Sequence, residues 1–472
     1  MMGCRCTRTN RSGPPGLGPA VYLTWVLLLA GLALAPPSIV LAQASRADDE
    51  LAEARRLNQE AATLYSSGKL AAAIPLVQRA LAIQEKALGP EHPDVAASLD
   101  ALAGLDRAQG NYREAERLYR RALAIREKAL GRGNPALVLS LNNLAGLYRA
   151  QGKYAEAEPL YRRALAIEEE SRGPENLSVA ASLDNLAGLY RAQGKYAQAE
   201  PLYRRALAIG EKSRGPEGLD VAASLNNLAG LYHAQGRYAE AEPLYRRALA
   251  IGEKTLGPEH PNIAANLNNL ALLYAAQGKS AESEPLQLRA LAIQEKALGL
   301  EHPDVATSLN NLAELERAQG KYAPAEPRYQ RALAIREKAL GPEHPAVAGS
   351  LSGLAELYQA QGAYAQAESR YRRALAILEK ALGPEHPDVA TVLDSLAGLY
   401  EAQGKYLQAE PRYRRALVIL EKALGPEHPD VATVLENFAA FLRKTNRAAV
   451  AQDMEARARI IRAKRAEIAP AK

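Results

Sequence analysis

A tripeptide recurs along the chain at a fixed interval, and this period limits what the chain can fold into. Ala-Gln-Gly ends at eight glycines, each 42 residues from the next: Gly110, Gly152, Gly194, Gly236, Gly278, Gly320, Gly362 and Gly404. The same step leads to Gly68 before the series and to Asn446 after it. Ten units of 42 residues then fill residues 51–470 of the 472, so we expect no separate catalytic domain. Units that bury their apolar faces only on their neighbours form a solenoid.

Each unit has the pattern of two consecutive helices. In residues 135–176 the apolar residues of the first helix recur at helical spacing on one face, and Gly152 follows where a left-handed residue ends a helix. A second helix begins near Tyr154 and ends at Gly173. Pro159, five residues after that start, is expected to kink the second helix or to delay its regular beginning. The inward-facing residues are Leu141, Leu144, Ala145 and Tyr148 in the first helix, and Ala157, Tyr161, Ala164, Leu165 and Ile167 in the second.

The predicted units follow directly from this phase. They are 51–92, 93–134, 135–176, 177–218, 219–260, 261–302, 303–344, 345–386, 387–428 and 429–470. The first and the last are degenerate in sequence, which is typical of the capping units that a solenoid needs at its ends.

The links between units supply helix boundaries. Gly89 ends one helix, and Pro93 takes the first position of the next. The residue before this proline is placed to cap the helix, and six of the seven histidines occupy that place: His92, His260, His302, His344, His386 and His428. The same place holds Asn134, Asn176 and Gly218 in other units. We therefore interpret the histidines as helix caps and expect no metal site.

The first 44 residues have the features of an export signal. Three arginines precede an apolar run over residues 20–35, and residues 42–44 read Ala-Gln-Ala, a pattern typical of a cleavage site. An uncleaved anchor formed by residues 20–41 is the alternative, although the Pro-Pro pair at 36–37 would break a helix there. We expect the body to be periplasmic or secreted, with membrane contact only through this segment if it remains.

Charge and cysteine content exclude several classes of function. The net charge is +6, but residues 45–442 carry 47 basic against 50 acidic residues. Such a body lacks the concentrated basic face that nucleic acid requires, so we expect no nucleic-acid partner. The two cysteines, Cys4 and Cys6, lie in the first 44 residues, which leaves the body without thiol chemistry. With no phosphate loop, no nucleophile elbow and no His-Glu-x-x-His, we expect neither an enzyme nor a cofactor.

The unit resembles the tetratricopeptide repeat. Leu-x2-Leu-Ala-x2-Tyr precedes Gly152 and Tyr-x2-Ala-x3-Tyr-x2-Ala follows it, with Leu141 where the family often has Trp. The 42-residue period and the Leu-Asn-Asn-Leu-Ala and Gly-Pro-Glu-His-Pro phrases are similar to the kinesin light chain subtype. The resemblance implies an all-α, right-handed superhelical solenoid of about ten hairpins that binds an extended peptide or a partner helix in its concave groove. An exported chain cannot share the kinesin motor partner.

A repeated pair of asparagines marks the face of the first helix opposite its buried stripe. Asn is unfavourable inside a helix, so its repetition at the same position needs an explanation. One interpretation is a ladder of amides along the groove that bonds the backbone of an extended ligand, carried by the Asn143 column. The other is that duplication preserved the residues and that their amides bond the neighbouring hairpin. The pair is Asn142 and Asn143, with equivalents at Asn58, Asn185, Asn226, Asn227, Asn268, Asn269, Asn310, Asn311 and Asn437.

Glycine and arginine follow on the same face. Gly104, Gly146 and Gly188 leave room for a ligand, and Arg107, Arg149 and Arg191 can each bind a carboxylate. In later units the arginine position becomes His233, Ala275, Arg317, Gln359 and Glu401. We therefore expect the N-terminal part of the groove to prefer acidic ligands. The alternative is a row of solvated helix ends that tolerates any polar residue.

Another arginine, eleven residues after the helix-ending glycine, occurs in all ten units. We interpret it as structural and expect it to pair across the stacked hairpins, with acids such as Glu158 or Glu200 five residues before it. Its members are Arg79, Arg121, Arg163, Arg205, Arg247, Arg289, Arg331, Arg373, Arg415 and Arg457. Asp106 and Glu316 replace the buried tyrosine of the first helix, and we expect local soft spots in those two units.

The sequence thus predicts a non-enzymatic scaffold whose partner is a protein or peptide. The groove residues that carry this hypothesis are Asn143, Asn185, Asn227, Asn269, Asn311, Arg107, Arg149 and Arg191. The alternative is a structural component of envelope assembly that binds through its convex face or through its basic C-terminal end, where Arg459 and Arg462 lie.

Overall fold

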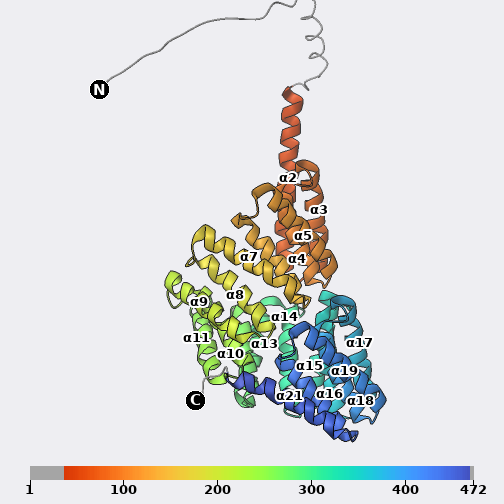
Figure 1. Cartoon of the computed structure of the whole chain (residues 1–472). Helices are drawn as coiled ribbons and strands as arrows, with labels where there is room; N and C mark the ends of the chain where they lie inside the picture. Colours follow the sequence, from red (N-terminus) through yellow and green to blue (C-terminus); the bar gives the residue numbers. More distant parts are fainter. Residues whose placement is uncertain (1–36, 468–472) are drawn as a thin grey trace, which may run out of the picture. The chain divides into compact units, whose positions relative to one another are not determined.

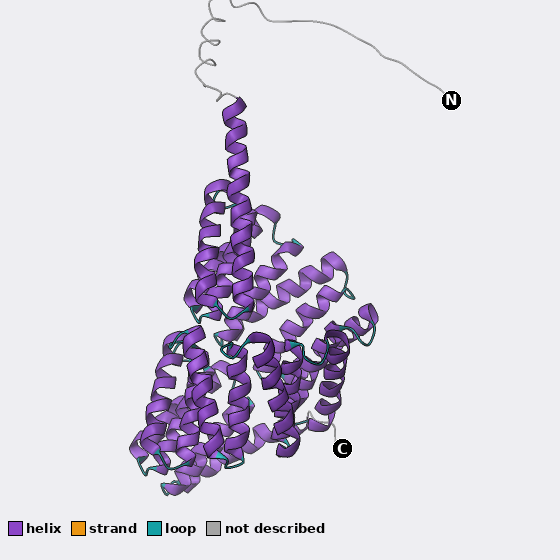
Figure 2. Cartoon of the chain, turned by 180° about the vertical axis from the view of Figure 1, so that it is seen from behind, coloured by secondary structure: helices purple, strands orange, loops and turns teal. Residues whose placement is uncertain are grey.

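A computed structural model describes residues 37–467 of the chain (Figure 1). The chain divides into two compact units, Met1–Ala52 and Glu53–Lys472. In the first unit the described residues form the beginning of α2 (Pro37–Ser66), so most of the predicted leader, residues 1–44, lies outside the described residues. The second unit is an array of helices. Within residues 37–467 no strand is present (Figure 2).

The array is built of helical hairpins, as the period predicts. After α2, the first helices of the units are α4 (Pro93–Ala108), α6 (Val138–Ala150, preceded by the short helix η1, Pro135–Leu137), α8 (Leu177–Ala192), α10 (Leu219–Ala234), α12 (Pro261–Ala276), α14 (Pro303–Ala318), α16 (Pro345–Ala360), α18 (Pro387–Ala402) and α20 (Pro429–Lys444). The second helices are α3 (Leu70–Leu88), α5 (Tyr112–Leu130), α7 (Tyr154–Arg172), α9 (Tyr196–Arg214), α11 (Tyr238–Leu256), α13 (Ser280–Leu298), α15 (Tyr322–Leu340), α17 (Tyr364–Leu382), α19 (Tyr406–Leu424) and α21 (Ala448–Glu467).

Local signals in the sequence set the ends of these helices. Each glycine of the Ala-Gln-Gly series has a positive φ, and Asn446 takes the same conformation with φ 60°. The six linking histidines cap helices as predicted, because Nδ1 of each accepts the backbone N–H two residues further on, at 3.2 Å for His92 and Asp94. Oδ1 of Asn134 and of Asn176 does the same.

The proline in the second helix does not delay that helix, so this half of the prediction is wrong. α7 contains Pro159, whereas α5 and α17 have no internal proline, yet all three begin at the equivalent tyrosine and span 19 residues. The start is fixed by the preceding left-handed glycine and by packing, which outweigh the loss of one backbone hydrogen bond.

The predicted stripes form the core. In the third unit Leu141, Leu144 and Ala145 are 3% exposed or less. Ala157, Tyr161, Ala164 and Ile167 of the second helix are buried as well, whereas Leu165 is half-buried and packs at the edge of the core. Each hairpin therefore buries one face on its own partner helix and on the next unit, as a solenoid requires.

The arginine found in every unit pairs across hairpins, as predicted, but with a different acid. Arg205 lies 2.6 Å from Glu169, which is 36 residues earlier in the preceding unit, and donates to the Pro174 carbonyl at 2.9 Å. Glu200 instead pairs with Arg204. Nine of the ten arginines follow this rule, whereas Arg79 pairs with Glu53 of its own unit. These ion pairs hold neighbouring second helices at a constant spacing.

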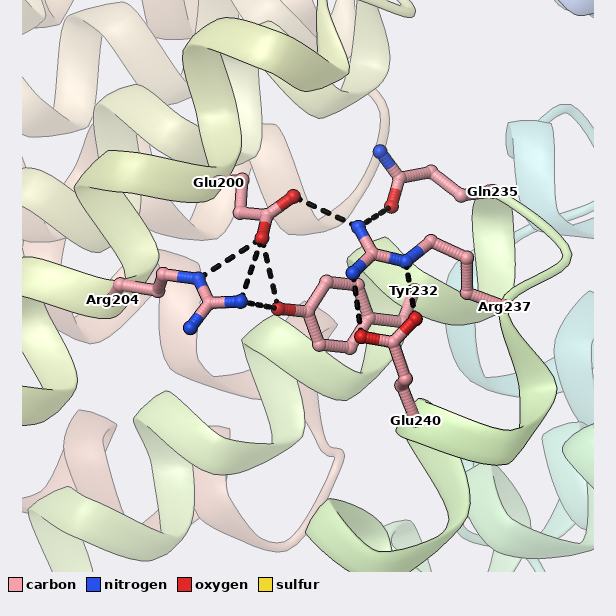
Figure 3. Close-up of polar contacts among 6 residues, drawn as sticks. All are labelled: Glu200, Arg204, Tyr232, Gln235, Arg237 and Glu240. Atoms are coloured by element: carbon pink, nitrogen blue, oxygen red, sulfur yellow. Dashed lines mark hydrogen bonds and ion pairs between the residues drawn. The ribbon is translucent and has the colours of Figure 1, made fainter. Parts of the chain in front are cut away.

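A polar cluster also joins each first helix to the preceding second helix. Figure 3 shows its most buried copy, in which the Tyr232 hydroxyl donates to Glu200 at 3.0 Å and accepts from Arg204 at 2.7 Å. The Arg237 guanidinium lies 4.0 Å from the centre of the Tyr232 ring and bonds Glu200 and Glu240. Tyr148, Tyr190, Tyr274 and Tyr400 have equivalent bonds.

The two departures from this tyrosine differ in their surroundings. Glu316 is 2.9 Å from Arg328, so its charge is compensated. Asp106 is buried and accepts one hydrogen bond of 3.3 Å from Asn111, and burial raises the pKa of its carboxyl. The predicted softness therefore has a stronger basis in the second unit than in the seventh.

The C-terminal units return to the N-terminal ones within the array. α15 packs against α3, and Nε2 of His386 lies 3.2 Å from the carbonyl oxygen of Ala150. The array therefore completes more than one turn, and its second turn touches its first. Among the helices of the described residues, none has the length and apolarity needed to cross a membrane.

Candidate binding groove

The two asparagine columns have different surroundings. The Asn142 column faces the next hairpin: Asn268 Nδ2 donates to Ser308 Oγ at 2.8 Å, and Asn310 to Ser350 at 3.0 Å. Equivalent bonds join Asn58 to Ser98 and Asn226 to Asn266, always at a separation of 40 residues. For this column the predicted open face is wrong, because its amides join neighbouring units.

Three units carry an aspartate in this column instead of an asparagine, and the first of them, Asp100, pairs with Arg126. Asp184 accepts from Ser224 Oγ at 3.1 Å through Oδ2, while its Oδ1 is buried without a partner. Asp394 accepts from Asn437 at 2.8 Å. Burial raises the pKa of both carboxyls to about 6. Their effect is on folding, because both face the neighbouring unit.

The Asn143 column is half-buried and largely unpaired. Within the described part of the chain, Asn143, Asn185, Asn269 and Asn311 make no hydrogen bond to another residue, whereas Asn227 bonds Asp184. A half-buried amide with free donors and acceptors can bond the backbone of a polypeptide that lies along it. The geometry is therefore compatible with the predicted ladder of amides.

Arginine and glycine of successive units interlock beside this column. A Cβ placed on Gly188 would lie 2.8 Å from Nη1 of Arg149 and 3.5 Å from the hydroxyl of Tyr203. A Cβ on Gly146 would lie 3.5 Å from Nη1 of Arg107 and 3.5 Å from the hydroxyl of Tyr161. A Cβ on Gly230 would likewise meet Arg191 and the hydroxyl of Tyr245. Each glycine thus makes room for the arginine of the preceding unit and for a tyrosine hydroxyl of its own.

These arginines carry charge that no carboxylate neutralises. Within the residues that the structure describes, Arg107, Arg149 and Arg191 form no ion pair, although most other arginines of the array do. Their nearest electrostatic neighbours are tyrosines: burial raises the pKa of Tyr245 to about 12, and Arg191 opposes that rise. Units 2–5 therefore present cations, hydroxyls and amides on one surface.

The C-terminal half of this surface satisfies its own polar groups. Arg317 lies 3.1 Å from Glu356 and also pairs with Glu314, whose carboxylate accepts from the Tyr329 hydroxyl at 2.8 Å. Glu401 accepts from the Tyr413 hydroxyl at 2.9 Å and pairs with Lys444 at 2.6 Å. A depression of about 410 Å³ here is lined by Arg317, Glu356, Gln359, Tyr371, Asp394 and Asn437.

The eight groove candidates remain predictions as binding residues, and sequence reasoning missed the tyrosines beside them. Tyr161, Tyr203 and Tyr245 were assigned to the core, and their rings are buried, yet their hydroxyls reach the groove beside a glycine. The signal was the coincidence of a glycine in one helix with a tyrosine in the other, 15 residues later. Among the residues searched, no three His, Cys, Asp or Glu side chains lie together so that they could hold a metal ion.

Comparison with known proteins identifies the repeat. The chain matches the tetratricopeptide repeat family over residues 50–128, 137–212, 220–296, 263–338, 304–380, 347–420 and 388–463. No curated protein is significantly similar to it.

Several solved structures are similar over part of the chain. A Podosopora anserina putative kinesin light chain with nearly identical TPR-like repeats is 34% identical, covering 43% of this chain and 96% of its own, with a TM-score of 0.37. BtubC (BKLC) from P. vanneervenii is 29% identical over 50% of this chain and 92% of its own, with a TM-score of 0.38. A Rap protein complexed with competence and sporulation factor is 17% identical over 79% and 99%, with a TM-score of 0.49.

Proposed function

Because the chain belongs to the tetratricopeptide repeat family, we propose that it is a protein-interaction scaffold that binds an extended, acidic polypeptide segment in the groove of units 2–5. Repeat arrays of this kind offer long concave surfaces to extended ligands. One observation carries the proposal: Arg107, Arg149 and Arg191 form no ion pair among the described residues, whereas Arg317 and Glu401 further along the same surface are both paired.

The chemistry of the free half favours carboxylates. A guanidinium group binds a carboxylate through two parallel hydrogen bonds, and such charge-assisted bonds are about twice as strong as neutral ones. Arg107, Arg149 and Arg191 recur once per unit, each packed over a glycine and beside a tyrosine hydroxyl. A ligand with acidic residues spaced along an extended backbone would meet the three arginines in succession, while the amides of Asn143 and Asn185 bond its backbone.

The experiment uses an array of random 12-residue peptides probed with the full chain. We expect the bound peptides to be enriched in Asp and Glu, and a variant with Arg107, Arg149 and Arg191 all changed to Gln to lose that enrichment. Each lost charge-assisted contact should weaken binding by about 1.5–3 kcal/mol.

A control variant changes Arg163, Arg205 and Arg247 to Gln. It has the same net charge, but these arginines pair with acids of the preceding units instead of facing the groove. Equal loss of binding in both variants would mean that overall charge decides the result, and unchanged binding in the groove variant would refute the proposal.

The alternative of end-on assembly through the basic tail finds less support. Arg457 pairs with Glu421, Arg462 with Glu436, and Lys464 with Glu427, so these charges are used within the last two units. A capping unit that satisfies its own charges is what the end of a solenoid needs for solubility.

We also propose that the body is exported, on the strength of the basic and apolar leader and the Ala-Gln-Ala sequence at residues 42–44. Cleavage after Ala44 would leave Ser45 as the first residue. N-terminal sequencing of protein purified from the envelope and from the medium tests this, because a chain that retains its first residues and stays in the cytoplasm would contradict it.

A further inference from the structure

Four of the glycines that end first helices are covered by a distant part of the chain. A Cβ on Gly110 would lie 2.9 Å from Cδ of Pro345 and 3.2 Å from Cδ2 of His344. Gly68, Gly152 and Gly194 have the same relation to the His-Pro pairs that begin at His302, His386 and His428. We call these four glycines the seats. The equivalent Gly278, Gly320, Gly362 and Gly404 have nothing within 4 Å of such a Cβ among the described residues.

The imidazoles bridge two helix ends across this contact. Nδ1 of His386 accepts the Asp388 N–H at 3.1 Å, while Nε2 lies 3.2 Å from the carbonyl oxygen of Ala150 at the C-terminus of α6. His344 bonds the Ala108 backbone and His428 that of Ala192 in the same way. Only the neutral imidazole that carries its proton on Nε2 can accept at one nitrogen and donate at the other.

The sequence of the cap varies only among units that do not make this contact. All four caps of the second turn are followed by proline, in the pairs beginning at His302, His344, His386 and His428. The departures from His-Pro, at Asn134, Asn176 and Gly218, all belong to units whose caps reach no seat, while His92 and His260 keep the pair without reaching one. A cap needs only a side-chain acceptor, which Asn supplies equally well, so capping alone does not require histidine at all four contacting positions.

The contact between the two turns of the array is narrow, and a cleft lies beside it. The cleft has a volume of about 1160 Å³ and is lined by Ala71 and Tyr112 of the first turn and by Ala339, His344 and Pro384 of the second. The two turns therefore meet through small seats next to open space and not through a continuous apolar core.

We propose that the seats and the four His-Pro pairs form a releasable latch that holds the second turn of the array on the first, and that the array opens when its imidazoles become protonated. A proton on Nδ1 would replace the acceptor that caps the helix and would place a positive charge at the positive end of the helix dipole. Opening separates units 1–4 from units 7–10, so it widens access to a groove that runs along both turns.

The charged groups around the imidazoles do not reverse this effect. Asp388 and Asp430 lie 3.7 Å from Nδ1 of His386 and His428 on their own helices, and they favour the protonated form. Arg336 near His344 opposes it. From the first turn the imidazoles of His344, His386 and His428 meet helix-end carbonyls, and Tyr112 and Tyr154 face Asp388 with raised pKa values, so both phenols stay neutral.

Burial lowers the pKa of His344, His386 and His428 in the closed array, despite Asp388 and Asp430. In an open array these side chains would titrate near the ordinary value of about 6.5. The open form therefore takes up protons first, so closure is fully favoured above about pH 6.5 and weakens as the pH falls below it.

Pulsed electron–electron double resonance measures the opening as a distance between spin labels on Ala71→Cys and Ala339→Cys. The labels are placed in the full chain with Cys4→Ser and Cys6→Ser. These alanines line the cleft from opposite turns and are not part of the latch. We expect one short distance at about pH 8 and a longer one whose share rises from about a tenth to about half at pH 5.5.

Matched variants separate the latch from general effects. Gly110→Ala with Gly152→Ala should open the array at pH 8, whereas Gly278→Ala with Gly320→Ala should not. Both pairs carry the same left-handed strain, and only the first collides with His-Pro. The combined changes His344→Asn, His386→Asn and His428→Asn keep the caps, so they should abolish the pH response without unfolding the helices. Identical distances in both glycine pairs, or a wild-type distance that does not change with pH, would overturn the proposal.

Discussion

Nε2 of His386 lies 3.2 Å from the backbone oxygen of Ala150, although 236 residues separate them. His92 caps its helix in the same way, through Asp94, but its side chain is 39% exposed and contacts none of the four seats. We expect His386→Asn to lower the free energy of unfolding by about 1 kcal/mol, the net value of one hydrogen bond. His92→Asn is the control and should cost no more than a few tenths of that. Thermal unfolding midpoints compare the two, and equal shifts would show that the capping bond alone matters.

Asp184→Asn should stabilise the array at neutral pH. The folded state raises the pKa of this carboxyl from 3.8 to about 6, so the folded chain holds the proton more tightly than the unfolded chain does. The contribution of Asp184 to stability is therefore greatest below about pH 4 and is lost as the pH rises through about 6. Asn carries no charge, and it already occupies this column at Asn142, Asn226 and Asn268.

The expected gain from Asp184→Asn is about 1–2 kcal/mol at pH 8 and none at pH 4, since one pKa unit corresponds to about 1.4 kcal/mol. Unfolding in urea at both pH values measures it. The exposed Glu170→Gln is the control for loss of a surface charge. A gain that is the same at both pH values would contradict the assignment of the effect to a buried charge.

Arg237→Ala should be more damaging than Lys195→Ala at the equivalent position. The Arg237 side chain is 5% exposed, stacks on Tyr232 and holds two carboxylates, whereas Lys195 is 45% exposed and lies 3.9 Å from Glu158. Removal of Arg237 leaves buried charge uncompensated, for which we expect a loss of about 2–3 kcal/mol. The exposed lysine should cost under about 1 kcal/mol. Combining Arg237→Ala with Glu200→Gln should recover part of the loss, and strictly additive costs would show that the pair is not coupled.

The second unit should exchange its amide hydrogens faster than the seventh. Asp106 is buried with a single hydrogen bond of 3.3 Å, whereas Glu316 has a cation 2.9 Å away. Hydrogen exchange followed by mass spectrometry should therefore find α4 less protected than α14, with α8 as a tyrosine-containing reference. Asp106→Leu should remove the difference. Exchange in α14 as fast as in α4 would mean that the ion pair gives Glu316 no advantage.

The helices could be predicted from the sequence because each boundary depends on a local signal, such as the left-handed glycine at 152 or the cap at His92. The bonds of the Asn142 column could not be, since their partners lie 40 residues further on and depend on the tilt between units, as in the pair of Asn268 and Ser308. The acid that pairs with Arg205 was misassigned for the same reason: the nearer Glu200 lies within its own helix, but the preceding unit supplies Glu169.

The contact between turns was beyond sequence reasoning altogether. It depends on the pitch of the array, which is the sum of many small rotations between units. Nothing at Gly152 distinguishes it from Gly278 in the tripeptide that both share, yet only Gly152 is covered.

The offset between a seat and its cap sets a minimum size for closure. The glycine of one unit meets the cap of the sixth unit beyond it, as Gly68 meets His302. A shorter relative with six units would contain no such contact, one with seven would contain a single one, and every added unit would contribute another. Bonds between adjacent hairpins would survive the duplication or deletion of any whole unit. Copy number alone could thus tune how firmly the molecule shuts, without a change in any side chain.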